Sequence, residues 1–166
     1  MSSTFSSFLL AAVEAKIAAE FPALDHMSPD ALDGLMKSGS GVIVLDVREE
    51  SEYAVSRLAG ARRVAPNADP AQFVKDIADE AKGKQVVFYC SVGKRSSTLA
   101  SKSVQGLKDA GAAGVHNLSG GIFRWSNEGR ALEKGPVSTP GKASNSGIVV
   151  HPYNSRWGAL IETPAS

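Results

Sequence analysis

The sequence predicts an α/β fold with a mainly parallel central sheet. Two short apolar runs, residues 42–45 and 86–89, are rich in β-branched and aromatic side chains. The first lies between Gly41 and Asp46 and the second ends directly on Cys90, as expected of strands buried on both faces. Segments with helical spacing separate these strands, and this alternation is typical of parallel α/β sheets. At 166 residues with 43% hydrophobic residues, the chain suits one domain with extensions.

The N-terminal part of the chain predicts two helices. Over residues 7–20 the apolar side chains recur near helical spacing, which indicates an amphipathic helix. We expect this helix to pack on the domain, with association with a partner as the alternative. The second helix begins after Ser28, which is a good N-cap, with Pro29 and Asp30 in its first turn, and it ends near Gly39.

The middle of the chain continues the alternation. A helix begins after Asp69, and Gln72 stands three residues later, as in a capping box. Residues 96–109 predict another helix, and residues 115–118 predict a further strand. The glycine pair at residues 120–121 permits a turn before the last helix.

Composition suggests extensions on both sides of the domain. We expect residues 1–24 to form an N-terminal helical extension, residues 25–133 to form the domain, and residues 134–166 to form a loop and a C-terminal extension. Residues 135–147 are rich in Gly, Pro, Ser, Thr and Asn, which is typical of a loop. Residues 148–166 are too apolar for an inert tail. They are expected to fold back on the core, or alternatively to bind a partner.

Charge and cysteine content exclude several classes of function. Eighteen basic and seventeen acidic residues leave a net charge of +1, which does not indicate nucleic-acid or anionic-membrane binding. No signal peptide is expected, nor an apolar stretch of about 18 residues that could span a membrane. One cysteine and three scattered histidines predict no disulfide and no metal site. These features favour a soluble, intracellular and cytoplasmic protein, and organelle targeting stays open.

Cys90 is the candidate nucleophile. It follows a predicted strand directly and precedes a loop with Gly93 and then a helix, so backbone N–H groups converge on its sulfur. The helix N-terminus and the neighbouring Lys94 and Arg95 add positive potential that favours a thiolate and could hold an anion. Ligands of open α/β sheets bind at this end of the strands. The alternative is an inert buried cysteine beside a solvated pair of cations.

Other side chains are expected to support the sulfur. Ser91 and Ser96 could donate hydrogen bonds to the sulfur or the substrate, or could merely cap the helix. Asp46 and Arg48 are expected to hold neighbouring loops through a charge-assisted hydrogen bond. The candidate substrate-binding residues are the whole loop and the residue after it, Ser91, Val92, Gly93, Lys94, Arg95 and Ser96.

Three motifs occur in order: VLDVR at residues 44–48, CSVGKR at residues 90–95 and GGIFRW at residues 120–125. With these motifs the chain resembles a single rhodanese domain, or thiosulfate sulfurtransferase, over residues 25–133. The resemblance implies a three-layer α/β/α fold with a mainly parallel sheet of about five strands. It also implies that Cys90 takes sulfane sulfur as a persulfide and passes it to a nucleophile, that loop amides stabilise the sulfur anion, and that no cofactor is needed.

Loop length separates rhodaneses from the similar Cdc25-type phosphatases and arsenate reductases, which have one more residue between cysteine and arginine. Here four residues intervene between Cys90 and Arg95, and none of them is an acid that could protonate a leaving group. The basic loop favours a small anionic donor such as thiosulfate over mercaptopyruvate. The expected acceptor is cyanide, a thiol or an acceptor protein.

The chain departs from the family at residues 56–61, SRLAGA, where rhodaneses usually have Gly-His-Ile-Pro-Gly-Ala. Arg57 stands where the family has histidine, and it could supply a different donor or help to attract anions. The competing hypothesis is a rhodanese-fold interaction module or sulfur carrier with little turnover, in which the N-terminal helix or the C-terminal segment binds a partner.

Overall fold

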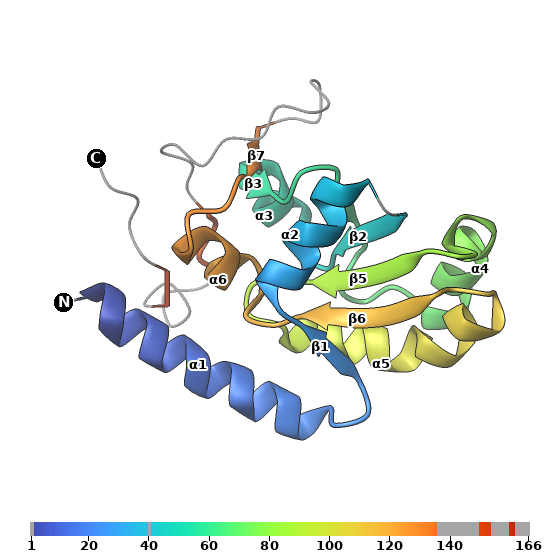
Figure 1. The fold of residues 1–166 in the computed structure, drawn as a ribbon, viewed down its shortest axis with the longest axis horizontal. Coiled ribbons are helices and arrows are strands. Elements are labelled where there is room, and N and C mark those ends of the chain that lie inside the picture. Colours follow the sequence, from blue (N-terminus) through green and yellow to red (C-terminus); the bar gives the residue numbers. More distant parts are fainter. Residues whose placement is uncertain (1, 40, 136–149, 154–159, 162–166) are drawn as a thin grey trace.

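The computed structural model describes residues 2–39, 41–135, 150–153 and 160–161. Its centre is a five-stranded sheet of order β1-β6-β5-β2-β4, in which all neighbouring strands run parallel (Figure 1). These strands are β1 (Asp25–Met27), β2 (Val42–Asp46), β4 (Arg62–Arg63), β5 (Gln85–Tyr89) and β6 (Gly114–Leu118). A separate antiparallel pair consists of β3 (Ser56–Arg57) and β7 (Glu133–Lys134). The predicted α/β fold with about five parallel strands is confirmed.

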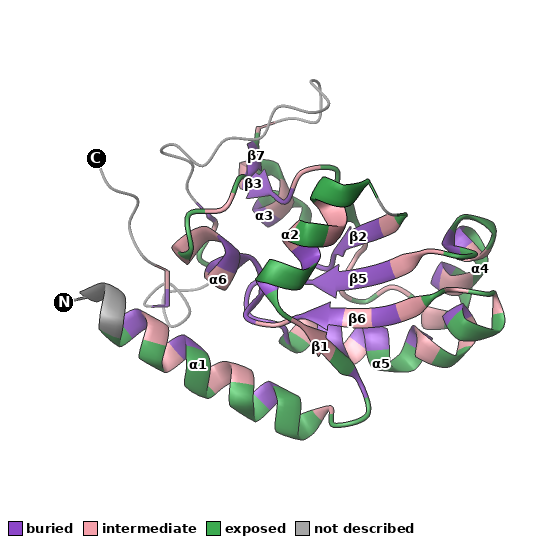
Figure 2. Cartoon of the chain, viewed as in Figure 1, coloured by how far each residue is buried: buried purple, intermediate pink, exposed green. Residues whose placement is uncertain are grey.

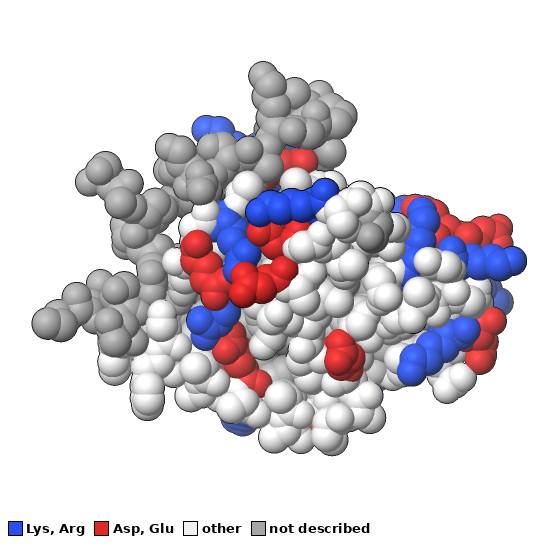
Figure 3. All heavy atoms as spheres, in the orientation of Figure 1, with Lys and Arg blue, Asp and Glu red and all other residues white. Residues whose placement is uncertain are grey.

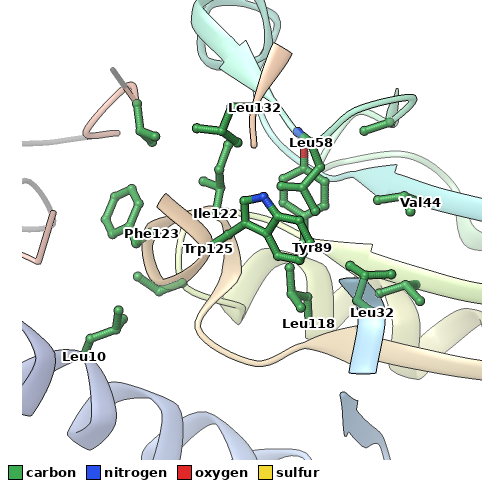
Figure 4. Packing of buried hydrophobic residues seen from close by; sticks show 14 of the residues in the cluster. Leu10, Leu32, Val44, Leu58, Tyr89, Leu118, Ile122, Phe123, Trp125 and Leu132 are labelled. Atoms are coloured by element: carbon green, nitrogen blue, oxygen red, sulfur yellow. Dashed lines mark hydrogen bonds between the residues drawn. The ribbon is translucent and has the colours of Figure 1, made fainter. Parts of the chain in front are cut away.

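Helices cover both faces of the sheet. They are α1 (Ser2–Glu20), α2 (Pro29–Ser38), α3 (Glu50–Val55), α4 (Pro70–Ala81), α5 (Lys94–Asp109) and α6 (Gly121–Asn127). Alternate residues of β2 and β5 enter two different cores. On one face Phe88 packs with residues of α4 and α5, and on the other Tyr89 packs with residues of α1, α2 and α6, including Trp125 (Figure 4). This is the three-layer arrangement expected from the sequence.

The signals at the start and end of α2 are confirmed. The Ser28 hydroxyl accepts a hydrogen bond from the backbone N–H of Ala31 at 3.2 Å, and Pro29 occupies the first turn. Gly39 ends the helix in the left-handed region with φ of 71°, a conformation that glycine adopts without steric cost.

The capping box predicted at α4 is only half correct. The Asp69 carboxylate accepts from the backbone N–H of Gln72 at 3.0 Å, as predicted. The Gln72 side chain, however, donates to Asp76 Oδ1 at 2.9 Å, one turn further along the helix. Asp76, at i+4, and the backbone of Asp69, at i−3, are both possible partners for the Gln72 side chain. The sequence alone does not choose between them.

α5 begins two residues earlier than predicted. Its N-cap is Gly93, with φ of 117°, so Lys94 and Arg95 lie in the first turn of a 16-residue helix. Ser96 therefore lies inside the helix and does not cap it. The strands β1 and β4 were not predicted individually, because each is only two or three residues long and carries no apolar alternation.

α1 packs on the domain, as predicted, although it begins well before residue 7. Leu10 and Ile17 are buried in the core cluster that also holds Trp125. Across the same contact, Arg124 Nη2 donates to a carboxylate oxygen of Glu14 at 2.9 Å. The opposite side of the helix is exposed (Figure 2), including Phe8, which is 71% exposed.

The described part of the C-terminal segment returns to the core. Val150 and Leu160 are buried in the same cluster as Trp125, and Asn127 Nδ2 donates to the backbone oxygen of Leu160 at 2.8 Å. These described residues therefore pack against the domain. Residues 136–147 of the predicted loop and the apolar residues Val149 and Trp157 lie outside the described residues.

Charged side chains of both signs are interspersed on the surface. Figure 3 shows Lys and Arg beside Asp and Glu on the face drawn there, in keeping with the 18 basic and 17 acidic residues of the chain. Among the described residues, none of the helices is long and apolar enough to cross a membrane. The same residues contain no cluster of His, Cys, Asp and Glu arranged to hold a metal ion.

Candidate active site

Cys90 lies between the C-terminal end of β5 and the first turn of α5. The residue is 1% exposed. The backbone N–H of Gly93 donates to its Sγ at 3.2 Å, and the hydroxyl oxygen of Ser96 lies 3.4 Å from the same sulfur. The sulfur therefore sits at the N-terminus of a long helix with a backbone donor and a hydroxyl beside it, an environment that stabilises negative charge.

Gly93 is required by both conformation and space. Its φ of 117° is strained for any residue with a side chain. A Cβ at this position would lie 3.1 Å from Asn117 Nδ2 and 3.7 Å from Ile17 Cδ1. The loop thus passes closely between β6 and α1, at the residue whose N–H donates to the sulfur.

α6 holds the other side of the loop. The backbone N–H of Ile122 donates to Cys90 O at 2.9 Å, and that of Phe123 donates to Ser91 O at 3.1 Å. Gly121 has φ of 58°, and a Cβ there would overlap both carbonyl oxygens. The sequence predicted only a turn at this glycine pair. The structure adds that the GGIFRW motif binds the carbonyls of the CSVGKR loop.

Arg95 is paired with a buried carboxylate. Its Nη1 and Nη2 donate to Glu52 Oε2 and Oε1 at 2.7 and 2.9 Å. Burial opposes ionisation of Glu52, but the hydrogen bonds from Arg95 and from the Glu49 backbone outweigh it and lower the pKa of this carboxyl. Sequence reasoning missed Glu52 as a site residue, although it follows the VLDVR motif closely.

Ser91 belongs to this ion pair. Its hydroxyl donates to Glu52 Oε1 at 3.2 Å and accepts from Arg95 Nη2 at 2.8 Å. Of the two roles predicted for Ser91 and Ser96, a contact with the sulfur is made by Ser96. Val92, the next loop residue, is 4% exposed and belongs to the core cluster on the α6 side of the sheet.

Lys94 points away from the core. Its ammonium group forms an ion pair with Glu20 and lies 5.2 Å from the centre of the Phe21 ring. The side chain remains 53% exposed. Both cations of the loop are therefore paired with carboxylates, so the positive potential near Cys90 is weaker than the loop sequence suggests.

The predicted hydrogen bond between Asp46 and Arg48 is present and completely buried. Arg48 Nε and Nη2 donate to Asp46 Oδ1 and Oδ2 at 2.8 and 2.7 Å, and Nη2 also donates to Ser56 O at 2.6 Å. The Tyr89 hydroxyl donates to the same carboxylate and accepts from the Leu58 N–H at 3.1 Å. This network fixes the end of β5 on which Cys90 depends.

Arg57 has a structural role, which corrects the prediction that it could attract anions. The side chain is 2% exposed, and its guanidinium lies 4.6 Å above the Tyr53 ring. Its Nη1 donates to Tyr53 O at 2.8 Å, and its Nε lies 3.5 Å from Glu133 Oε2. Arg57 thus joins β3 to β7, because its charge is more stable beside Glu133 than unpaired in the core.

Two segments outside the central motifs border the loop. The Tyr153 ring lies 4.1 Å from the Arg95 guanidinium, and Ile17 of α1 approaches Gly93. Asn117 of β6 contacts the residue that follows the loop, since its Oδ1 accepts a hydrogen bond from Ser96 Oγ at 2.7 Å. No local sequence pattern indicates the roles of Asn117 and Tyr153, because both are far from Cys90 along the chain.

Sequence comparison finds one family. The sequence model of the rhodanese-like domain family matches residues 28–128. An uncharacterized protein of Synechocystis is 30% identical over 104 residues, covering 62% of this chain and 52% of that protein. The tRNA uridine(34) hydroxylase of Rhodococcus erythropolis is 34% identical over 106 residues, covering 60% of this chain and 35% of that enzyme. The chain thus spans between a third and about half of the length of these curated relatives.

Structural comparison finds the same fold. A thiosulfate sulfurtransferase from Pseudomonas aeruginosa aligns with a TM-score of 0.56 at 20% identity, covering 86% of this chain and 25% of that one. A Saccharomyces cerevisiae protein, described as a homolog of single-domain rhodanese and the Cdc25 phosphatase catalytic domain, aligns with a TM-score of 0.55 at 18% identity. This alignment covers 64% of this chain and 82% of the yeast protein's chain. At these identities the likeness is one of fold.

Proposed function

Because the chain belongs to the rhodanese-like domain family, we propose that it is a sulfurtransferase that carries sulfane sulfur as a persulfide on Cys90. The observation that carries this proposal is the position of Sγ, which accepts the Gly93 N–H at 3.2 Å at the N-terminus of α5. A sulfur anion at this place is stabilised by a backbone dipole in a site that excludes water.

The proposed reaction has two balanced steps. In the first, the Cys90 thiolate attacks the outer sulfur of thiosulfate, a new S–S bond forms, and the old S–S bond breaks with its electron pair leaving on sulfite. In the second, cyanide or a thiolate attacks the terminal sulfur of the persulfide, and the Cys90 thiolate is released with the bonding electrons. The two steps need no further oxidant, reductant or cofactor.

The loop residues have different roles in this proposal. Lys94 would attract the anionic donor, because solvent screens an ion pair between exposed side chains and Lys94 can therefore leave Glu20 easily. Arg95 is held by Glu52 and would shape the loop. Ser96 would donate its hydroxyl to the sulfur anion.

The direct test is a single-turnover experiment. The protein is incubated with thiosulfate, desalted and analysed by intact mass spectrometry. We expect one added sulfur, located on Cys90, and thiocyanate on addition of cyanide. The Cys90→Ser variant is the matched control and should show neither. If the wild-type protein forms neither the sulfur adduct nor thiocyanate, the hypothesis that it is a sulfurtransferase is wrong.

The second candidate is a rhodanese-fold interaction module or sulfur carrier with little turnover. The 1% exposure of Cys90 and the contacts of α1 and Tyr153 around the loop favour it, because a donor must displace something to reach the sulfur. A complementation experiment separates the candidates. Cells that carry Cys90→Ser should lose the cellular role of a sulfur carrier or enzyme, and should keep that of a pure binding module.

The tRNA substrate named for several relatives is not part of this proposal. The chain spans 35% of the Rhodococcus enzyme, and its net charge of +1 does not favour a polyanion as partner. The proposed donor is thiosulfate, and the proposed acceptor is cyanide, a thiol or an acceptor protein.

A further inference from the structure

We propose that His26 and Asn117 are positioning residues that determine whether the Ser96 hydroxyl donates to the Cys90 sulfur or accepts from it. Their contacts form one continuous chain. His26 Nε2 lies 3.1 Å from Phe21 O, and His26 Nδ1 lies 3.1 Å from Asn117 Nδ2. Asn117 Oδ1 then accepts from Ser96 Oγ at 2.7 Å, and Ser96 Oγ lies 3.4 Å from Cys90 Sγ. The inference rests on the proposed function of Cys90.

The direction of these hydrogen bonds follows from the Phe21 carbonyl, which is the backbone group at one end of this series of contacts. A carbonyl oxygen only accepts, so Nε2 of His26 carries the hydrogen that is donated to Phe21 O. In the neutral imidazole, Nδ1 then has a lone pair, and the Asn117 amide must present its Nδ2 hydrogen to it. This fixes Asn117 Oδ1 toward Ser96.

Ser96 has one hydroxyl hydrogen and two possible acceptors. The Asn117 oxygen at 2.7 Å is the closer and stronger acceptor, while the sulfur at 3.4 Å is a weak one. The hydrogen is therefore committed to Asn117, and the Ser96 oxygen presents a lone pair to Cys90. This arrangement suits the neutral thiol, whose S–H can donate to Ser96.

To stabilise a sulfur anion, Ser96 must donate its hydrogen to Cys90 Sγ instead of accepting one from it. When Cys90 becomes a thiolate, Ser96 must turn its hydrogen to the sulfur and give up Asn117 Oδ1. Both side chains are buried, Ser96 at 0% and Asn117 at 1% exposure, so water does not replace the lost hydrogen bond. His26 thereby opposes formation of the anion. When His26 is replaced, the Asn117 amide can rotate and offer Nδ2 to the Ser96 oxygen. The Ser96 hydroxyl hydrogen is then free to bind the sulfur.

Asn117 is placed to transmit this effect by the fold itself. It lies on β6 directly across from His26 in the parallel register of β1 and β6. Its amide also lies under the loop, 3.1 Å from where a Cβ of Gly93 would stand. Other polar side chains near this series of contacts have partners of their own, since His116 binds Asp25 on these strands and Lys94 binds Glu20.

The test uses the fact that Cys90 is the one cysteine of the chain, so ultraviolet thiolate absorbance reports this residue alone. In His26→Leu we expect the ratio of thiolate to thiol near neutral pH to rise about tenfold, close to the net value of one hydrogen bond. In His26→Asn the amide oxygen can replace the Nδ1 acceptor, so the wild-type ratio should return. His116→Asn is the matched control on β6 and should leave the ratio unchanged.

Two further variants make the result decisive. Asn117→Ala removes the competing acceptor directly, so it should raise the ratio as His26→Leu does, and it replaces that variant if His26→Leu does not fold. In a Ser96→Ala background, His26→Leu should have no effect, because the hydroxyl that transmits it is absent. An unchanged ratio in a folded His26→Leu or Asn117→Ala protein would overturn the inference. Absorbance needs no sulfur donor, so its outcome is independent of the thiosulfate assay.

Discussion

The Glu52 carboxylate binds the Arg95 guanidinium through two hydrogen bonds, at 2.7 and 2.9 Å, and thereby joins α3 to the first turn of α5. The carboxylate also accepts from the Ser91 hydroxyl and from the Glu49 backbone N–H. A single buried acid thus caps one helix and fixes the loop that carries Cys90. This pair explains why Arg95 shapes the site although its charge is compensated.

Replacement of Glu52 by Gln is expected to lower the free energy of unfolding at neutral pH by about 1–3 kcal/mol, because hydrogen bonds to a charged group are lost in a buried place. The stability difference should depend on pH. Arg95 lowers the folded-state pKa of Glu52 below the usual 4.5, so this contribution is complete above pH 4.5 and is lost as the pH falls through the lower folded-state value. Urea unfolding at a series of acidic pH values measures it.

Glu80→Gln is the control for the Glu52 experiment. Glu80 also pairs with an arginine, Arg62, but both side chains are nearly half exposed. Solvent screens such a pair, so the wild-type and variant stability curves should nearly coincide. If Glu52→Gln behaves in the same way as Glu80→Gln, the buried pair does not hold the loop.

Gly93→Ala is expected to destabilise the protein by about 1–3 kcal/mol, since φ of 117° is strained with a Cβ and the new methyl group would crowd Asn117. Thermal unfolding measures the effect, and sulfur loading on Cys90 should fall with it. Gly34→Ala on α2 has open space and should be neutral or stabilising by about 0.5–1 kcal/mol. Equal stability of the two variants would contradict the tight passage of the loop.

Tyr89→Phe should lower the free energy of unfolding by about 1–3 kcal/mol. The hydroxyl is completely buried, where burial and the nearby Asp46 raise the pKa of Tyr89, so it stays neutral and donates to Asp46. Its loss leaves the Leu58 N–H and the Asp46 carboxylate each without one partner. Tyr53→Phe, which removes a half-buried hydroxyl bound to Ala61 O, is the comparison and should cost less. Urea denaturation of both variants ranks them.

Leu10→Ala should lower the free energy of unfolding by about 2–5 kcal/mol, because this fully buried side chain of α1 lies in the main core cluster. Phe8→Ala removes a larger side chain from the same helix, but one that is 71% exposed, and should have little effect. Both are measured by thermal unfolding. A neutral Leu10→Ala would mean that α1 is not an integral part of the core.

Much of the fold was predictable because its signals are local. Ser28 and Asp69 begin helices through hydrogen bonds to residues three positions away, and Gly39 ends a helix through its own left-handed backbone conformation. The apolar strands follow from short runs that are buried on both faces. The short strands β1 and β4 were missed individually because the sheet, and not their own sequence, decides that they pair.

The sequence by itself determined the parallel α/β fold, the position of Cys90 after a strand and before a helix, and the loop of four residues that leads to Arg95. Only the tertiary structure decided the partners of that loop. Glu52 is 43 residues from Arg95, Asn117 is 21 residues from Ser96, and His26 is 91 residues from Asn117. Hydrogen bonds between such distant groups depend on strand register and helix packing, and no local pattern encodes them.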